Sequence, residues 1–183
     1  NRGRVSNGVE MQRSVIGWVL LAVLGLSLAT FARAQTWQNE LALWTDAVKV
    51  SPHKPRPFIN LGLALEQAKD WDGALQAHQT AFALAFQPRL SLYQQRFSQV
   101  ASETNIARIL AQTGHEVEAE RMLTDIVRRH PAFSFSRWNY GVLLARTGRC
   151  AEAIPQWQAA MQLDPAFGPM PTCIEPSVLK EQP

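Results

Sequence analysis

The sequence predicts an all-α protein in which a single N-terminal membrane-spanning helix precedes a solenoid of helical hairpins. Two observations lead to this prediction. The first is a run from Ser14 to Ala32 that contains no charged side chain. The second is a repeated spacing of 34 positions, which separates Gly114 from Gly148, Ala119 from Ala153, and Pro131 from Pro165. A fixed period of this length indicates repeated structural units.

The composition is that of a folded protein without a concentrated basic face. Of the 183 residues, 46% are apolar and 18% are charged, which excludes a disordered chain. Eighteen Lys and Arg exceed fifteen Asp and Glu, but from Ala34 onward the two signs are equal in number. Nucleic-acid binding needs a concentrated positive field, so we expect no nucleic-acid partner.

The apolar run predicts a transmembrane helix over residues 14–34, surrounded by membrane lipid. As a helix, the uncharged run from Ser14 to Ala32 covers roughly 28 Å of hydrocarbon, which is just enough to span a bilayer. The alternative is a cleaved signal peptide, because Met11-Gln12-Arg13 could serve as a basic start and Ala32-Arg33-Ala34 as a cleavage site. The run exceeds the usual apolar region of a signal peptide, about 7 to 15 residues, and this favours an anchor.

Charge beside the predicted span sets its orientation. Arg2, Arg4 and Arg13 precede the span, whereas Arg33 after it is offset by Glu40 and Asp46. Because basic flanks stay in the cytoplasm, residues 1–13 are predicted to be a cytoplasmic tail. In a Gram-negative cell this gives a single-pass inner-membrane protein with a periplasmic solenoid.

A stripe of small residues follows one face of the predicted span. Its members are Ala22, Gly25, Ala29 and Ala32. Such a stripe lets a second helix approach closely in lipid, which predicts transmembrane packing against a partner. The alternative is that small residues are simply common in membrane spans.

The last 34-residue unit carries the landmarks of a known repeat family. They are Tyr140, Gly141, Leu144, Gly148, Ala153, Trp157, Ala160 and Pro165. At these positions the chain resembles the tetratricopeptide repeat, in which each unit is a helix A followed by a helix B. The resemblance implies small residues where the two helices cross and a proline that ends helix B.

The same landmarks divide residues 35–165 into about 3.5 repeats. The predicted units are a half repeat at 36–52 and repeats at 55–88, 100–133 and 134–167, followed by a Pro-rich tail at 166–183. The spacing of 45 between Ala74 and Ala119 predicts an insertion at 87–99. Because residues 90–112 contain neither Pro nor Gly, we expect helix A of the middle repeat to be extended toward its N-terminus.

A second, narrower resemblance covers about residues 15–65. The apolar span is followed by Arg33, Trp37, Leu43-Trp44, Pro52 and Asn60-Leu61-Gly62. This order resembles the junction in transmembrane, tetratricopeptide-containing O-mannosyltransferases and their bacterial relatives. In that family, glycosyl transfer belongs to a multi-span portion that this sequence does not contain.

No residue pattern for catalysis, cofactor binding or a metal is found. The histidines at 53, 78, 115 and 130 do not form a ligand motif, and no nucleophile elbow, phosphate loop or dinucleotide fingerprint occurs. His78 stands at a helix-B position that normally packs in the core. We therefore expect no cofactor, no metal and no enzyme activity.

The resemblance to tetratricopeptide repeats implies a concave groove lined by helix A. Its expected residues are Arg56, Ile59 and Leu63 in the first full repeat and Phe135, Trp138, Val142 and Arg146 in the last. The family's chaperone-binding set of Lys and Asn is missing, so that specialised activity is not implied. An apolar groove favours a partner helix or an extended peptide. The alternative is that the chain's own tail fills it.

Cys150 and Cys173 are the only cysteines, and in an oxidising compartment they could pair.

The prolines of the tail exclude the helix that usually closes such a solenoid. Either the tail or a partner subunit is then expected to cover the open end.

The predicted function is that of a membrane-anchored scaffold. It would be a non-catalytic accessory or assembly subunit that binds other membrane subunits through its helix and its solenoid. The alternative is the non-catalytic C-terminal part of a multi-span glycosyltransferase-like protein.

Overall fold

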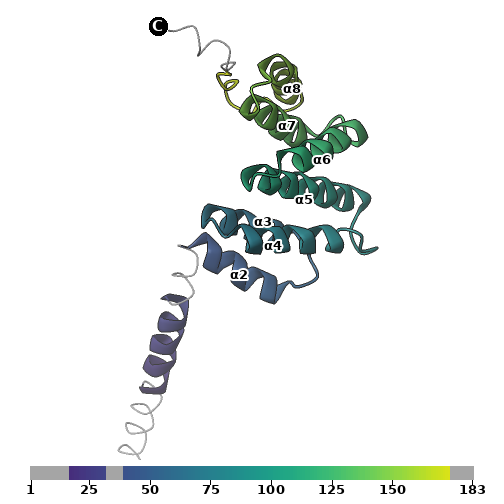
Figure 1. Ribbon diagram of the computed structural model, residues 1–183. Helices are drawn as coiled ribbons and strands as arrows, with labels where there is room; N and C mark the ends of the chain where they lie inside the picture. The colour runs from purple at the N-terminus through teal and green to yellow at the C-terminus, as the bar shows by residue number, and fades with distance from the viewer. Residues whose placement is uncertain (1–16, 32–38, 174–183) are drawn as a thin grey trace, which may run out of the picture. The chain divides into compact units, whose positions relative to one another are not determined.

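The computed structural model describes residues 17–31 and 39–173. Within these ranges the regular secondary structure is entirely helical (Figure 1). The chain divides into two units, Asn1–Leu43 and Trp44–Pro183, which are described separately. The all-α fold class predicted from the sequence is confirmed for the described residues.

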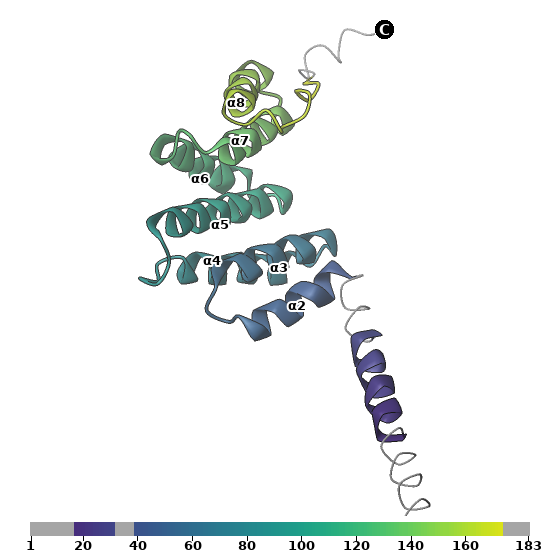
Figure 2. The same ribbon diagram turned by 180° about the vertical axis from the view of Figure 1, so that it is seen from behind.

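Seven helices lie within the described residues 39–173. They are α2 (Glu40–Val50), α3 (Pro55–Gln67), α4 (Trp71–Leu84), α5 (Leu92–Gln112), α6 (Glu116–Arg129), α7 (Ser134–Arg146) and α8 (Cys150–Leu163). The last six form three consecutive hairpins, α3/α4, α5/α6 and α7/α8. Each hairpin also packs against the next one, through α4 with α5 and α6 with α7. Figures 1 and 2 show the three hairpins stacked in chain order.

Each of the three hairpins turns with the same hydrogen bond. The amides of Asp70, His115 and Arg149 donate to carbonyls five residues earlier, at distances of 2.8 to 2.9 Å. This closure requires a left-handed residue just after helix A. Gly114 and Gly148 supply it with φ of 87° and 79°, whereas the first hairpin uses Lys69 at 61°.

The two helices of a hairpin cross at one tightly packed slot. In the first hairpin the ring of fully buried His78 lies against Gly62, and in the third the ring of Trp157 lies against Gly141. A methyl group on Gly141 would come within 2.5 Å of Trp157 Nε1. The middle hairpin places Ala107 and Leu123 in one cluster at the corresponding positions. A ring-bearing residue on helix B therefore lies against a glycine on helix A, whereas a leucine on helix B lies against an alanine.

A buried polar network joins the first hairpin to the second. Glu66 of α3 is 8% exposed, and its Oε1 lies 2.9 Å from His78 Nε2. The same oxygen accepts a 2.9 Å hydrogen bond from Arg108 of α5, which also donates to Asn105. The carboxylate thus links α4 of its own hairpin with α5 of the next.

Hydroxyl groups join the second hairpin to the third. The oxygens of Thr104 on α5 and Ser136 on α7 are 2.7 Å apart, and both residues are fully buried. Arg149 before α8 pairs with Glu120 of α6 and with Glu152, and its hydrogen bonds lower the pKa of the Glu152 carboxyl. Polar contacts therefore accompany apolar packing between successive hairpins.

The start of α5 is held in place by local hydrogen bonds. Ser91 and Gln94 form a capping box, in which the Ser91 hydroxyl accepts from the Gln94 amide and the Gln94 side chain accepts from the Ser91 amide. Such reciprocal bonds satisfy amide donors at a helix N-terminus. Gln95 Nε2 also donates to the carbonyls of Gln87 and Leu90 in the preceding loop.

The N-terminal unit contains a described helix at 17–31. Its large apolar side chains are exposed, among them Trp18 and Leu26 at 71% and 69%. Across the described residues, no helix is both long and apolar enough to cross a membrane. At about 1.5 Å per residue, 17–31 covers only roughly 22 Å, so the spanning helix predicted over residues 14–34 is not shown. Its ends, 14–16 and 32–34, lie outside the described residues.

The slot of the third hairpin gives a first prediction. The effect of a mutation at Gly141 on the free energy of unfolding should change sign with the residue at position 157. We expect Gly141→Ala to lower the free energy of unfolding by about 2 kcal/mol, because the added methyl overlaps the Trp157 ring. In a Trp157→Leu background the same change should raise that free energy, by up to about 1 kcal/mol, through the higher helix propensity of alanine. Urea unfolding followed by circular dichroism measures both effects.

The middle hairpin justifies this comparison, since Ala107 and Leu123 already form the alanine-leucine version of the slot. Equal losses from Gly141→Ala in both backgrounds would contradict the matched packing. The double-mutant cycle isolates the contact from the cost of Trp157→Leu itself.

The Glu66 network gives a second prediction. Glu66→Ala should lower the free energy of unfolding by about 3 kcal/mol, because it leaves buried His78 and partly buried Arg108 without their acceptor. Gln67→Ala is the matched control, since Gln67 follows on the same helix but is exposed. Losses of equal size in the two variants, measured by urea unfolding, would show that the network does not stabilise the stack.

Candidate interaction site

The predicted groove of the last repeat is lined by α7 and covered by the chain's own tail. Trp138 is partly buried, with its ring centroid 6.2 Å from that of Trp157 and 4.8 Å from that of Phe167. Phe167 stacks on Trp138 at an interplanar angle of 22°. Val142 packs against the cluster of Leu144, Ala153 and Trp157. The apolar part of this groove is therefore in contact with residues C-terminal to α8.

The tail reverses direction directly after α8. Asp164 accepts hydrogen bonds from the Ala166 amide through its side chain and from the Phe167 amide through its carbonyl, at 3.0 and 3.3 Å. These bonds form a tight turn that brings Phe167 to Trp138. Met170 then lines a shallow depression together with Gln158, Met161 and Gln162 of α8.

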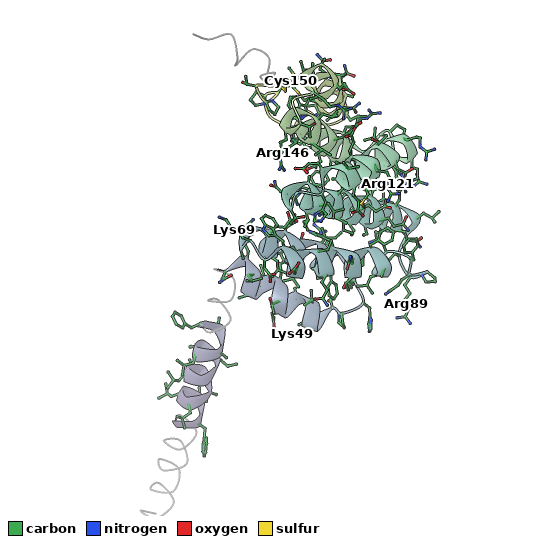
Figure 3. The ribbon with its side chains drawn as sticks, in the orientation of Figure 1. Lys49, Lys69, Arg89, Arg121, Arg146 and Cys150 are labelled. Carbon is green, nitrogen blue, oxygen red and sulfur yellow. A yellow bond between two sulfur atoms is a disulfide. The ribbon has the colours of Figure 1, made fainter. Side chains whose placement is uncertain are left out.

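A disulfide joins the tail to the start of α8. Cys150 and Cys173 are bonded, with their Cα atoms 5.6 Å apart, and Figure 3 labels Cys150. Cys173 packs against the same apolar cluster as Val142 and Trp138. Residues 164–173 therefore return along the last hairpin, and the disulfide closes the loop.

The remaining groove residues are distributed differently. Phe135 is partly buried, and Arg146 is exposed and donates to the carbonyl of Ala111 at 3.2 Å. In the first full repeat, Arg56 is exposed and Leu63 partly buried. Ile59 is only 7% exposed and packs with Ala81 and Ala101, because α5 closes over this part of α3. Its side chain belongs to the core.

Three members of the small-residue stripe, Ala22, Gly25 and Ala29, lie on the described helix and are exposed. A methyl group built on Gly25 would meet nothing within 4 Å. Ala32 lies outside the described residues. This face is therefore open within its own unit.

The extension of α5 exposes an aromatic ridge, defined here as Leu92, Tyr93 and Phe97. Leu92 and Tyr93 are 80% and 77% exposed. Tyr93 stacks on Phe97 with a centroid distance of 6.2 Å, and Phe97 contacts Phe133 at 5.7 Å. Within the ridge, Phe97 packs against Phe133, while Leu92 and Tyr93 face solvent. Nothing in the repeat period predicts these side chains.

Two exposed arginines lie close to the ridge in the sequence. Arg96 is exposed within α5, and Arg89 lies in the α4–α5 loop (Figure 3). At the end of α6, Arg129 is already paired with Asp125 and Glu103, and hydrogen bonds from Arg128 and Arg129 lower the pKa of the Asp125 carboxyl. The carboxylates of Asp125 and Glu103 are therefore already paired.

The described residues do not assemble a metal site. Nowhere in 17–31 or 39–173 do three or more His, Cys, Asp or Glu gather to bind an ion. His78 lies in the core beside Glu66, and His115 bonds through Nδ1 to the Thr113 hydroxyl at 3.1 Å. His130 is partly buried, and burial lowers its pKa.

Comparison with known proteins identifies the repeat. Residues 104–167 match the model of the tetratricopeptide repeat family, a range that covers the C-terminal part of α5 and all of α6, α7 and α8. A second similarity, 35% identity over 63 residues, is to Protein O-mannosyl-transferase TMTC3 of Homo sapiens. The match covers 33% of this chain but only 7% of that protein.

The chain also matches solved structures at low sequence identity. MamA 41-end from Desulfovibrio magneticus RS-1 shares 17% identity and a TM-score of 0.49 over 76% of this chain and 75% of its own. The MamA RS-1 ArsTM double mutant shares 18% identity and a TM-score of 0.48 over 77% of this chain and 72% of its own. YrrB, a TPR protein, shares 15% identity and a TM-score of 0.37 over 76% of this chain and 84% of its own. The comparisons show a similarity to the tetratricopeptide repeat over residues 104–167 of this chain.

Proposed function

We propose that the chain is a membrane-anchored scaffold, a non-catalytic accessory or assembly subunit of a larger membrane protein complex. The observation that carries this proposal is the aromatic ridge. Two large apolar side chains there are more than three quarters exposed on a helix start that is already fixed by its own hydrogen bonds. Exposed aromatic patches are typical of protein-protein contact sites.

The architecture supports a binding role. Stacked hairpins bury apolar faces against their neighbours and leave extended outer surfaces, rather than an enclosed cavity. The depression beside α8 is shallow and lined by two glutamines and two methionines. Such a surface can hold a partner but supplies no acid, base or nucleophile.

The proposed anchor is the apolar segment at 14–34. The exposed apolar side chains of helix 17–31 would be stable in lipid and costly in water. The stripe of Ala22, Gly25 and Ala29 offers room for a neighbouring helix. The arginines before the segment favour a cytoplasmic N-terminus and a periplasmic solenoid.

A second candidate is the non-catalytic repeat portion of a multi-span glycosyltransferase-like protein. The 35% identity to a human O-mannosyl-transferase favours it. An antibody against the solenoid distinguishes the two in native membranes. A band near the size of this chain supports the single-span scaffold, whereas a much larger band supports the glycosyltransferase portion.

The topology gives a third prediction. Protease added to the periplasmic side of intact spheroplasts should degrade residues after Ala34. The cytoplasmic N-terminal tail should resist until the membrane is opened, which epitope tags at the two ends would report. Protection of the solenoid in intact spheroplasts would reverse the proposed orientation.

The ridge gives a fourth prediction. Leu92→Ser combined with Tyr93→Ser should reduce the amount of complex recovered in mild detergent at least tenfold, since aromatic anchors dominate many interfaces. Blue native electrophoresis measures the complex. Because both side chains are exposed, circular dichroism of the variant should be unchanged.

Val117→Ser is the matched control, because Val117 is an equally exposed apolar residue at 87%, located on α6. It should leave the complex intact. Equal losses in the control and the ridge variant would mean that general surface hydrophobicity, rather than the ridge, determines recovery.

A further inference from the structure

We infer that the groove surface formed by Trp138 and Val142 is a binding site for a proline-containing segment with an aromatic side chain. We further infer that residues 164–173 are its resident ligand, and that the Cys150–Cys173 disulfide controls access. The inference rests on the proposed scaffold function and names the chemistry of one class of partner.

The tail is held at two points. Phe167 stacks on Trp138 with centroids 4.8 Å apart, and Cys173 is bonded to Cys150 within the Leu144–Ala153–Trp157 cluster. Among the described residues, no hydrogen bond joins the segment between Gly168 and Cys173 to α7 or α8. The segment is therefore attached by an aromatic contact and a covalent bond, not by a backbone ladder.

The resident segment defines the ligand class. It contains Pro165, Pro169 and Pro171 around the aromatic anchor. Prolines favour an extended backbone and lower the entropy that a segment loses on binding. The aromatic ring is matched by the indole of Trp138, whose other neighbour is the Trp157 ring at a centroid distance of 6.2 Å. Trp157 Nε1 also donates to the backbone carbonyl of Trp138 at 3.2 Å, which links α8 to the α7 backbone at this point. A similar segment from another chain would present the same groups.

Reduction of the disulfide would loosen the resident segment. Cys150 is only 5% exposed, whereas Cys173 is partly exposed, so a reductant reaches the Cys173 sulfur first. A thiolate of a dithiol attacks that sulfur and releases Cys150, which takes up a proton. The second thiol of the reductant then displaces Cys173. Two electrons have passed to the protein, the dithiol has become a disulfide, and both cysteines are thiols.

Once the disulfide is reduced, the tail remains connected to the groove only through the chain after α8, and it competes with other segments for the groove as a tethered ligand. A short tether still gives a high effective concentration, so removing the bond alone would open the site partially. Removing the aromatic anchor as well should open it fully. The test therefore needs a variant that lacks both attachments.

The experiment uses the full chain in detergent micelles and a fluorescein-labelled peptide with the sequence of residues 164–173 carrying Cys173→Ser. Fluorescence anisotropy measures peptide binding to the oxidised chain and to a Phe167→Ala/Cys173→Ser variant. We expect the variant to bind at least tenfold more tightly than the oxidised chain. Wild type treated with dithiothreitol should fall between them.

The matched control is the same peptide with Phe167→Ala, which tests the stacking without altering the protein. It should bind the open variant at least tenfold more weakly, and Trp138→Ala in that variant should cause a similar loss with the original peptide. If Trp138→Ala does not fold, the peptide control still decides the point.

Two results would overturn the inference. Absence of peptide binding to the open variant would exclude the site, and equal binding by the oxidised chain would exclude control by the disulfide. Neither result affects the scaffold proposal, which depends on recovery of the complex with the ridge variant. Retained complex in the ridge variant would contradict the scaffold proposal and leave the peptide site intact, so the two failures are distinguishable.

Discussion

The close crossing of the two helices in each hairpin is the constraint on which the rest of the structure depends. At Gly62 and Gly141 the backbone of helix A approaches so closely that an aromatic or imidazole ring from helix B occupies the space of a missing side chain. The small residues that surround the crossing, among them Ala74, Ala119 and Ala153, are completely buried. Close packing of this kind leaves few alternatives for side-chain size. The crossing therefore fixes which residue sizes each hairpin can hold at this point.

The contacts between hairpins differ in kind from those within them. Glu66 with Arg108 and Thr104 with Ser136 are directional pairs that form only when successive hairpins are in register. Apolar contacts alone would tolerate sliding, whereas a buried carboxylate or hydroxyl without its partner is costly. The polar pairs therefore specify how the hairpins stack, and the apolar slots specify how each hairpin closes.

The sequence was informative where one requirement recurs in every repeat. The period of 34 reflects the crossing slot and the left-handed turn, so Gly114, Gly148 and the paired alanines located the hairpins directly. Lys69 escaped this pattern because a lysine holds the position that glycine has elsewhere. Glu66 and Arg108 are 42 positions apart, and no local pattern predicts that they meet. These interactions occur once, so periodicity cannot detect them.

The groove residues could likewise be predicted from the repeat. The choice between a partner and the chain's own tail as occupant of the groove could not. The resemblance to tetratricopeptide repeats placed Trp138 and Val142 in the groove, but the stacking of Phe167 depends on a turn made by Asp164 after the last helix. The burial of Ile59 depends on α5 of the next hairpin. Both outcomes are set by tertiary contacts.

The capping box at Ser91 has a consequence for how the aromatic ridge would meet another molecule. Because the first turn of α5 is already closed by Gln94 and Gln95, the backbone beneath Tyr93 is ordered before any encounter. A surface that is ordered in advance does not lose that conformational freedom on association, a loss of about 0.5 to 1.5 kcal/mol for each immobilised side chain in a flexible site. The ridge can therefore act by lock-and-key contact, with shape rather than folding on binding selecting its partner.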